Sequence, residues 1–167
     1  MDHELLNVVD PNDVVLGHST KSDIKKRGLN YRCVQIFLFN GANELLICKR
    51  PETKKMYAGR YASVMGHVRR GESYEDAAYR EVKEELGVNT RLTRITKFSI
   101  LEGGSRIFQE IYSGGVSGEL KPDKTEISEH KFISIRDLRS EMVTNSHRFA
   151  PPFLEAVRAF MKAKNIY

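Results

Sequence analysis

The sequence has no tryptophan and only two cysteines among its 167 residues. A chain so poor in cysteine does not rest on a disulfide framework. Cys33 and Cys48 each lie in an apolar, strand-like run, and neither has residues nearby that would complete a metal pair or a catalytic thiol site. We therefore expect two buried thiols in a protein of a reducing cytoplasm.

Long apolar runs are also absent, since no stretch approaches the length of a membrane-spanning helix. The first six residues, MDHELL, lack the basic region and apolar run of a secretion signal. We expect no membrane association and a cytoplasmic location. Internal repeats and linkers rich in Pro, Gly and Ser are absent too, which favours one domain over residues 1–167, with a hairpin and connector at 1–30 packed on it.

Neither sign of charge dominates the chain, because 27 Lys and Arg residues stand against 22 Asp and Glu residues, a net charge of +5. This excess suits a small phosphorylated ligand. It is too diluted by acidic residues to predict a nucleic-acid polymer as partner. The 40% apolar and 29% charged residues are typical of a folded, soluble protein.

Apolar periodicity and turn-forming residues predict a mixture of strands and helices. A hairpin is expected at 4–18, followed by a polar connector at 19–30 with one helical turn at most. Strands are expected at 32–39, 44–49, 61–65, 91–101, 106–116 and 131–135, with loops at 50–60, 66–72 and 117–130. Helices are expected at 74–86, at 137–142 and from 151 onward. This mixture implies an α/β or α+β sandwich with a mixed sheet.

The helix expected at 74–86 carries the most informative residues. Ser73 is predicted as its N-cap, Asp76 follows three residues later, and Gly87 comes just past its end. One apolar stripe along this helix contains Tyr74, Ala78, Val82 and Leu86.

Three glutamates accompany this stripe. Each residue advances by about 100° around a helix, which places Glu81 and Glu85 at one edge of the stripe and Glu84 further out. Like charges at this spacing repel each other, and glutamates in the last turn oppose the helix dipole. A divalent cation would relieve these costs, and carboxylate ligands suit Mg²⁺ or Mn²⁺. A solvated acidic surface is the alternative, and periodicity alone leaves it open.

The residues around this helix complete a longer motif. Gly66 is followed after five residues by Glu72, and after seven more by Arg80 and Glu81. The motif then continues with apolar Val82, any residue, Glu84, Glu85, any residue, Gly87 and apolar Val88. At every defined position this segment resembles the Nudix box of the Nudix hydrolase superfamily. The resemblance implies a Nudix-type α/β/α sandwich with a mixed β-sheet. It further implies hydrolysis of nucleoside diphosphates linked to another moiety, or of nucleoside di- and triphosphates, with Mg²⁺ or Mn²⁺.

The same resemblance implies roles for individual residues. Glu72 and Arg80 correspond to an ion pair that positions the acids. The metal ligands implied are the carboxylates of Glu81, Glu84 and Glu85 and the backbone carbonyl of Gly66. The catalytic residues implied are Glu81, Glu85, Arg80 and Glu110, while the identity of the general base stays open among Glu81, Glu110, Glu126 and Glu129. A small phosphorylated substrate is expected, and many relatives are dimers, so a homodimer remains an alternative.

A basic loop at 50–60 precedes the motif. One interpretation is that this loop binds the phosphates of the substrate, and the alternative is that it is a solvated charged loop. Arg50 is the best candidate to bind substrate phosphate, because it ends a strand expected to point toward the site. Tyr57 and Tyr61 are expected to pack the loop.

The run 38–72, together with the hairpin, also resembles isopentenyl-diphosphate isomerases, which share the Nudix fold. The catalytic cysteine of those enzymes corresponds here to Met65, whose thioether cannot form a thiolate. Their upstream metal-binding histidines are replaced around Lys25 and Arg32, although His67 is retained, and Glu110 matches their catalytic glutamate. We expect His67 to be a loop histidine with a structural hydrogen bond. A non-catalytic ligand-binding module is a further alternative, which the complete set of box acids disfavours.

Overall fold

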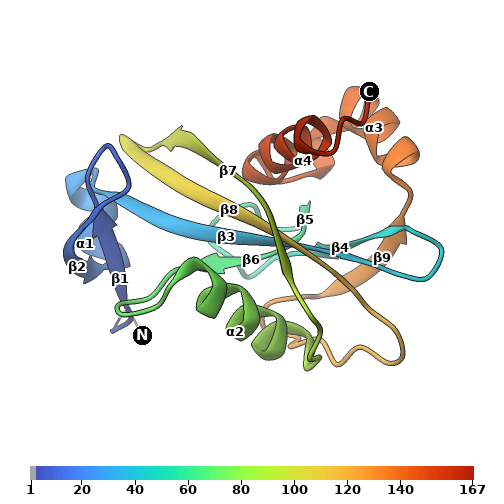
Figure 1. Ribbon diagram of the computed structural model, residues 1–167, viewed down its shortest axis with the longest axis horizontal. Coiled ribbons are helices and arrows are strands. Elements are labelled where there is room, and N and C mark those ends of the chain that lie inside the picture. Colours follow the sequence, from blue (N-terminus) through green and yellow to red (C-terminus); the bar gives the residue numbers. More distant parts are fainter. Residues whose placement is uncertain (1–2) are drawn as a thin grey trace.

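The structure is a computed structural model that describes residues 3–167, so the first two residues of the expected domain and hairpin lie outside it. Figure 1 shows a twisted sheet with α2 on one side and α3 and α4 on the other. In chain order the elements are β1 (Leu5–Val9), β2 (Val15–Thr20), α1 (Lys21–Arg27), β3 (Asn30–Phe39), β4 (Leu45–Lys49), β5 (Tyr61–Ala62), β6 (Val64–His67), α2 (Tyr74–Leu86), β7 (Thr93–Glu102), β8 (Ser105–Gly115), β9 (Glu129–Ile133), α3 (Ile135–Thr144), a 3₁₀ turn η1 (Ser146–Arg148) and α4 (Pro151–Ala163). No helix in residues 3–167 has the length and apolar character needed to cross a bilayer.

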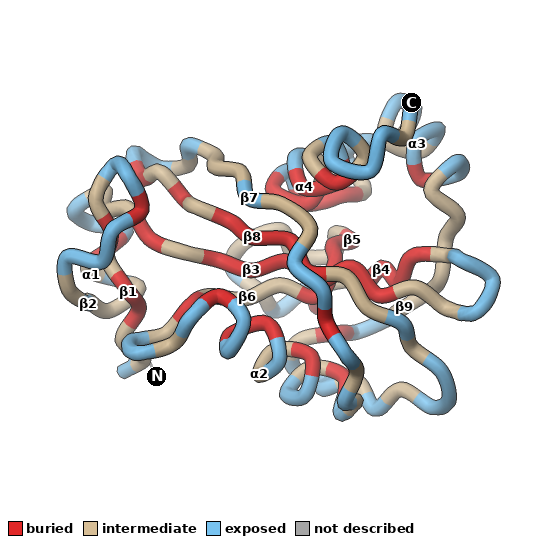
Figure 2. Tube along the Cα trace, viewed as in Figure 1, coloured by how far each residue is buried: buried red, intermediate tan, exposed pale blue. Residues whose placement is uncertain are grey.

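The sheet is mixed, as the sequence predicts. Its centre is the parallel pair β3 and β8, which Figure 2 shows as two largely buried strands. The remaining pairs are antiparallel: β3 with β1, β4 and β6, β8 with β7, β1 with β2, and β4 with both β5 and β9. Strand β6 pairs with β3 and is followed by α2, so β3 holds the motif segment in place.

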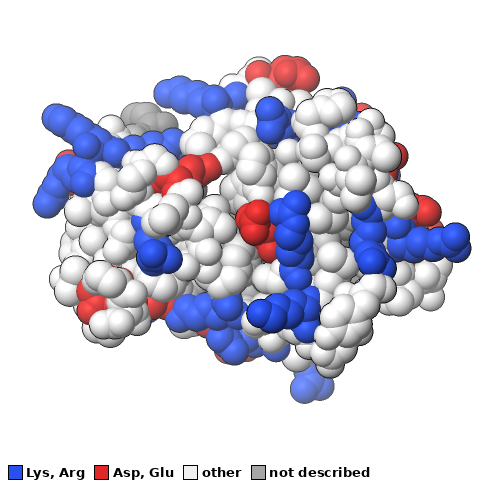
Figure 3. Space-filling view, turned by 90° about the horizontal axis from the view of Figure 1, so that it is seen from above, with Lys and Arg blue, Asp and Glu red and all other residues white. Residues whose placement is uncertain are grey.

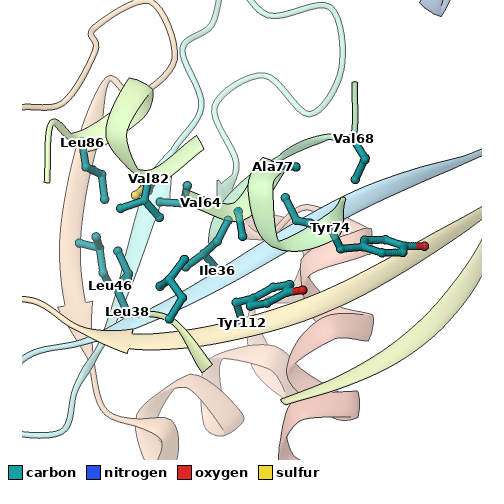
Figure 4. Packing of buried hydrophobic residues seen from close by; sticks show 14 of the residues in the cluster. Ile36, Leu38, Leu46, Val64, Val68, Tyr74, Ala77, Val82, Leu86 and Tyr112 are labelled. Carbon is teal, nitrogen blue, oxygen red and sulfur yellow. The ribbon is translucent and has the colours of Figure 1, made fainter. Parts of the chain in front are cut away.

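Two apolar layers lie on opposite faces of this sheet. Alternate residues of β3 divide between them, since Ile36 packs in the layer under α2 and Phe37 packs in the layer under α4. Figure 4 shows the first layer, in which Val82 and Leu86 of α2 lie over strand residues such as Leu46. Burying each such side chain contributes about 1.5–3 kcal/mol. The α/β/α sandwich is confirmed.

Helix α2 has the predicted bounds and the predicted caps. The Ser73 hydroxyl accepts a hydrogen bond from the Asp76 backbone N–H at 3.0 Å, and the Asp76 carboxylate accepts one from the Ser73 N–H at 3.0 Å. At the other end Gly87 has φ +66°, a left-handed conformation that glycine adopts without strain. The caps fix the start of the helix, and with it the direction in which each glutamate points.

The connector at 19–30 is more ordered than predicted. It contains the seven-residue helix α1, capped by the Thr20 hydroxyl and ended by Gly28 at φ +63°. Its apolar anchor, Ile24, is only 1% exposed and packs with Leu6 of β1. A single buried residue in a basic segment gives little periodicity, which is why the sequence predicts a connector here.

The predicted strand at 61–65 and loop at 66–72 are wrong in their boundaries. The strand breaks at Ser63, because β5 pairs with β4 whereas β6 pairs with β3. The Ser63 hydroxyl donates to Gln35 Oε1 at 3.0 Å inside the core, which stabilises the break. Gly66 and His67 therefore belong to a strand, directly opposite Val34 and Cys33.

The elements after β8 differ from prediction at their ends. Strand β9 begins two positions early, at Glu129, and α3 spans Ile135–Thr144 instead of 137–142. The Ser134 hydroxyl accepts from the Asp137 N–H at 3.0 Å and starts α3. Helix α4 begins at Pro151, as predicted, and buries Phe153, Val157 and Phe160.

Candidate functional site

The site is built where β6 passes beneath α2. The backbone at Gly66 comes so close to the Glu81 side chain that a Cβ atom there would lie 2.0 Å from Glu81 Oε1 and 2.1 Å from its Cδ. Glycine is therefore required by close approach rather than by backbone conformation. This contact brings the first and fourth defined residues of the motif together.

Arg80 organises the acids around it. Its Nε donates to Glu72 Oε1 at 2.5 Å and its second terminal nitrogen donates to Glu72 Oε2 at 3.0 Å, a two-pronged pair. The other terminal nitrogen donates to Glu81 Oε1 at 2.6 Å, and the His67 carbonyl accepts a further bond at 2.9 Å. Burial alone would raise the pKa of Glu72, but the Arg80 hydrogen bonds lower it overall. The arrangement supports a positioning role for Glu72 and Arg80.

Glu81 and Glu85 form a partly buried carboxylate pair. Burial is the main cause that raises the pKa of Glu85 well above its ordinary value, and the neighbouring carboxylates of Glu81 and Glu126 add to it. Burial also raises the pKa of Glu81, although the Arg80 charge opposes the shift. Two neighbouring carboxylates that are largely removed from water lose hydration and repel each other, and a bound cation would offset both costs.

Glu84 stands further out, as the helical geometry predicts. Its side chain is 49% exposed and lies 3.3 Å from both Arg69 and Arg80. Arg69 also contacts the Glu4 carboxylate, and the Asn7 amide donates to the Glu72 carbonyl at 3.2 Å. The N-terminal strand is thereby tied to the motif, a connection that no local sequence signal reveals.

The residues present fit a divalent cation in their chemistry. Three carboxylates and the backbone carbonyl of Gly66 are hard oxygen donors that Mg²⁺ or Mn²⁺ prefers. Within residues 3–167 no three acidic, imidazole or thiol side chains already converge as a closed ligand cluster. The Glu81 carboxylate is held by Arg80 instead.

Glu110 contacts other residues than the motif acids do. It is 7% exposed, its carboxylate is 3.0 Å from Arg94 Nε, and it accepts a hydrogen bond from the Tyr112 hydroxyl at 2.7 Å. It shares the α2 face of the sheet with Tyr112, near the first turn of that helix rather than the last.

The two other candidate bases differ from each other. Glu126 raises the pKa of Glu85 by its charge, so it lies beside the pair, where Lys54 Nζ contacts it at 2.6 Å. Glu129 instead accepts a hydrogen bond from the Tyr61 hydroxyl at 2.6 Å. Tyr61 packs in the layer under α4, so Glu129 points away from the α2 site.

Arg50 lies near Glu85 and His67. Its Nε donates to the Met56 carbonyl at 3.0 Å, which folds the 50–60 loop over it, and its charge acts on both Glu85 and His67. Tyr57 and Tyr61 pack in the layer under α4, as expected.

Helix α1 supplies two site residues that the sequence reasoning missed. Burial lowers the pKa of His67 to about 3, and the charges of Lys21 and Lys25 are the next causes. Lys25 also reaches Met56 of the 50–60 loop at 3.1 Å. Lys21 and Lys25 follow the Thr20 cap and are four residues apart, so they lie on the same face of α1. This spacing is the sequence signal that identifies them.

The expectation for His67 is corrected in part. It is a strand residue, and its ring lies 5.7 Å from the Tyr31 ring. The partly buried imidazole, with a pKa of about 3, is neutral at physiological pH. The two cysteines are free and buried, as predicted.

We expect divalent metal to stabilise the fold in a pH-dependent way. The native pKa values of Glu81 and Glu85 are raised, so the metal-free fold loses stability as pH rises from the unfolded value of about 4.5 through the native values. A cation replaces the proton and removes that loss. With Mg²⁺ at about 100 times its Kd, we expect the Tm to rise by roughly 5–10 °C at pH 8 and by less at pH 5, measured by calorimetry against EDTA. An equal shift at both pH values would contradict the pair as ligands.

Comparisons with known proteins agree with this geometry. A model of the NUDIX domain matches residues 30–156. A Nudix hydrolase of Pseudomonas aeruginosa is 34% identical, covering 97% of this chain and 96% of that protein. Isopentenyl-diphosphate Delta-isomerase 2 of Photorhabdus laumondii is 32% identical over 82% of this chain and 81% of its own length. Prenyl-diphosphate phosphatase of Methanosarcina mazei is 25% identical over 95% of each chain. A crystal structure from Deinococcus radiodurans superposes with a TM-score of 0.82 at 24% identity, covering 94% of this chain and 99% of that one.

Proposed function

Because the chain belongs to the Nudix hydrolase family, we propose that it is a metal-dependent hydrolase that cleaves a diphosphate bond by attack of water on phosphorus. The bond lies in a nucleoside diphosphate linked to another moiety, or in a related phosphorylated small molecule. The observation that carries this proposal is the partly buried Glu81–Glu85 pair, with Glu81 packed against Gly66 within a complete motif. Two buried free thiols are consistent with a cytoplasmic enzyme.

Each residue has a defined task in this proposal. Glu81, Glu84, Glu85 and the Gly66 carbonyl would hold Mg²⁺ or Mn²⁺, which supplies positive charge to the phosphate oxygens and makes water more acidic. One carboxylate of the Glu81–Glu85 pair would accept the proton of the attacking water. Arg50 binds a phosphate of the substrate, and Arg80 with Glu72 keeps the pair in place. Glu126, which lies beside the pair, and Glu110, oriented by Arg94 and Tyr112, are the other candidate bases.

The proposal is tested with the purified chain and a panel of substrates. The panel contains nucleoside di- and triphosphates, ADP-ribose, dinucleotide cofactors and diadenosine polyphosphates, each assayed with Mg²⁺ and with Mn²⁺. We expect at least one to be hydrolysed only when metal is present. A Glu110→Gln variant then locates the base, because a large loss of kcat with an unchanged fold would place Glu110 at the reacting centre.

A prenyl diphosphate is a second candidate substrate. Lys21, Lys25 and Arg50 gather their charges around His67, next to an apolar cluster that includes Tyr31 and Ile107. These cations suit a diphosphate, and the relative from Methanosarcina mazei is a prenyl-diphosphate phosphatase. A prenyl diphosphate therefore belongs in the panel, with phosphate release as the readout.

Isomerisation of isopentenyl diphosphate is not expected. Met65 cannot act as the catalytic thiol. Arg32, near which those enzymes carry a metal-binding histidine, is engaged with Asp13: its Nε lies 2.7 Å from Asp13 Oδ1, and it donates to the Asp13 carbonyl at 2.6 Å. We expect no deuterium to enter isopentenyl diphosphate from heavy water. Deuterium incorporation without hydrolysis of any panel member would overturn the hydrolase proposal. A chain that binds panel members without turnover would instead be a binding module.

A further inference from the structure

A cavity opens beside α2, between this helix and the segment 88–91 that leads into β7. Figure 1 shows the chain turning from the end of α2 into the start of β7. The volume of the cavity is about 480 Å³, and its walls include Tyr79, Val82 and Lys83 of the helix and Val88, Asn89 and Arg91 of the segment. A helix and the chain that returns along it thus enclose a hollow on the outside of the motif.

The cavity lies on the flank of α2 that faces away from the paired glutamates. Each residue advances by about 100° around a helix, so Glu85 and Glu81 lie about 60° and 100° to one side of Val82. Tyr79 and Lys83 lie about 60° and 100° to its other side by the same arithmetic. Val82 is 2% exposed and belongs to the buried stripe. The stripe therefore separates the cavity from the catalytic acids.

Hydrogen bonds hold the returning segment in place. The Tyr79 hydroxyl accepts from the Leu92 backbone N–H at 3.0 Å, which joins the helix to the start of β7. The Thr90 hydroxyl donates to the Gly115 carbonyl at 2.6 Å, which joins the segment to the end of β8. At its other end the segment leaves the helix through Gly87 in the left-handed conformation. The shape of the cavity is thus fixed before any ligand arrives.

The polar side chains of the cavity walls are basic or neutral. No carboxylate belongs to the walls. Within residues 3–167 the side chains of Lys83 and Arg91 form no ion pair and the Asn89 amide group makes no hydrogen bond, and all three residues are exposed. Val82 and Val88 also line the cavity, and both pack with the core under α2. Two unpaired cations therefore stand beside an apolar floor.

Exposed basic side chains alone do not mark a site. Figure 3 shows that they also lie over the face that carries α4. Arg80 borders the cavity too, but its guanidinium is engaged by Glu72 and Glu81. What distinguishes Lys83 and Arg91 is that both border one hollow that has an apolar floor and no acid. Cations gathered in this way repel each other unless an anion joins them.

We propose that this cavity binds a small organic phosphate at a site separate from the catalytic glutamates. Its volume lies within the range of small-ligand sites. Lys83 and Arg91 are the donors for the phosphate group, because lysine and arginine recognise phosphate by charge and by hydrogen bonds. Val82 and Val88 are the surface for the apolar body of the ligand. Binding here requires neither metal nor hydrolysis, so the proposal stands independently of the catalytic function.

The test is a titration of the metal-free chain with phenyl phosphate in EDTA, followed by backbone amide NMR at constant ionic strength. We expect saturable shifts at Lys83, Asn89 and Arg91, and weaker binding of inorganic phosphate, which has no apolar body. A Lys83→Gln, Arg91→Gln double variant should weaken the binding of phenyl phosphate by about tenfold or more. Lys83→Gln alone is the milder variant, since it changes one exposed side chain.

The matched control is Lys162→Gln, which removes the same charge from an exposed position of α4. We expect it to leave the binding unchanged. An equal loss in Lys162→Gln and Lys83→Gln would overturn the proposal, because net charge alone would then explain the binding. Shifts confined to the surroundings of Gly66, and lost in Arg50→Gln, would overturn it by showing that the probe enters only the catalytic side. Equal affinity for inorganic phosphate would overturn the assignment to an organic phosphate. Metal-dependent hydrolysis is measured separately and is unaffected by any of these results.

Discussion

Glu85→Gln is expected to lower kcat by about 10²-fold or more while the fold remains intact. The side chain keeps its shape but loses the charge that a cation at this site requires. The same change should raise the Tm of the metal-free chain at pH 8, because it removes a partly buried carboxylate whose pKa is raised by desolvation and by Glu81. Activity and metal-free stability would thus move in opposite directions, a pattern that simple misfolding does not produce.

The matched comparison for this variant is Glu84→Gln. Glu84 is one position away on the same helix but is about half exposed, so we expect a smaller loss of kcat and little change in Tm. Steady-state kinetics in saturating Mg²⁺ and calorimetry in EDTA measure both effects. Wild-type rates in Glu85→Gln and Glu81→Gln together would require the mechanism to be abandoned.

Gly66→Ala is expected to have an effect of similar size for a steric reason. The new Cβ would lie 2.0 Å from Glu81 Oε1 and 2.7 Å from its Cγ, far inside contact distance. Glu81 must then leave its place beside Arg80, and we expect kcat to fall about 10²-fold. Metal affinity, followed by Mn²⁺ titration, should fall as well, because a displaced carboxylate is a lost ligand.

Gly41→Ala provides the control for this substitution. A Cβ at Gly41 meets no heavy atom within 4 Å, so the variant changes only the entropy of the unfolded chain. Normal activity in Gly41→Ala together with a loss in Gly66→Ala would assign the effect to the Glu81 contact. Full activity in Gly66→Ala would mean that the Glu81 position seen here is dispensable.

Local signals in the sequence predict the motif helix well. Ser73 and Asp76 bond to each other at the first turn of α2, and Gly87 ends its last turn. Each signal acts on nearby residues only, so the sequence is enough to fix both ends of the helix. The orientation of Glu81 and Glu85 then follows from helical periodicity. The close approach at Gly66 also agrees with the resemblance, although the expected loop there is a strand.

The remaining features depend on contacts between distant segments. The break at Ser63 is set by two different partner strands, and a pattern of apolar residues cannot show which partner each half chooses. Lys25 joins the site only because α1 docks beside the 50–60 loop. The side of the sheet on which Glu129 lies follows from pairing across β4, so the sequence could name it as a candidate base but could not exclude it.

The parallel pairing of β3 with β8 has a consequence for the order of folding. Asn30 and Arg106, which meet where these strands begin, are separated by 76 positions, and the entire motif lies in the chain between them. Closing so long a loop has a large entropic cost before any contact offsets it, so such pairings form slowly. During synthesis the glutamates of α2 emerge well before β8 does. Strands β3 and β6, on which α2 packs, also precede β8 in the chain, so the glutamates can take their places before the last central strand joins the sheet.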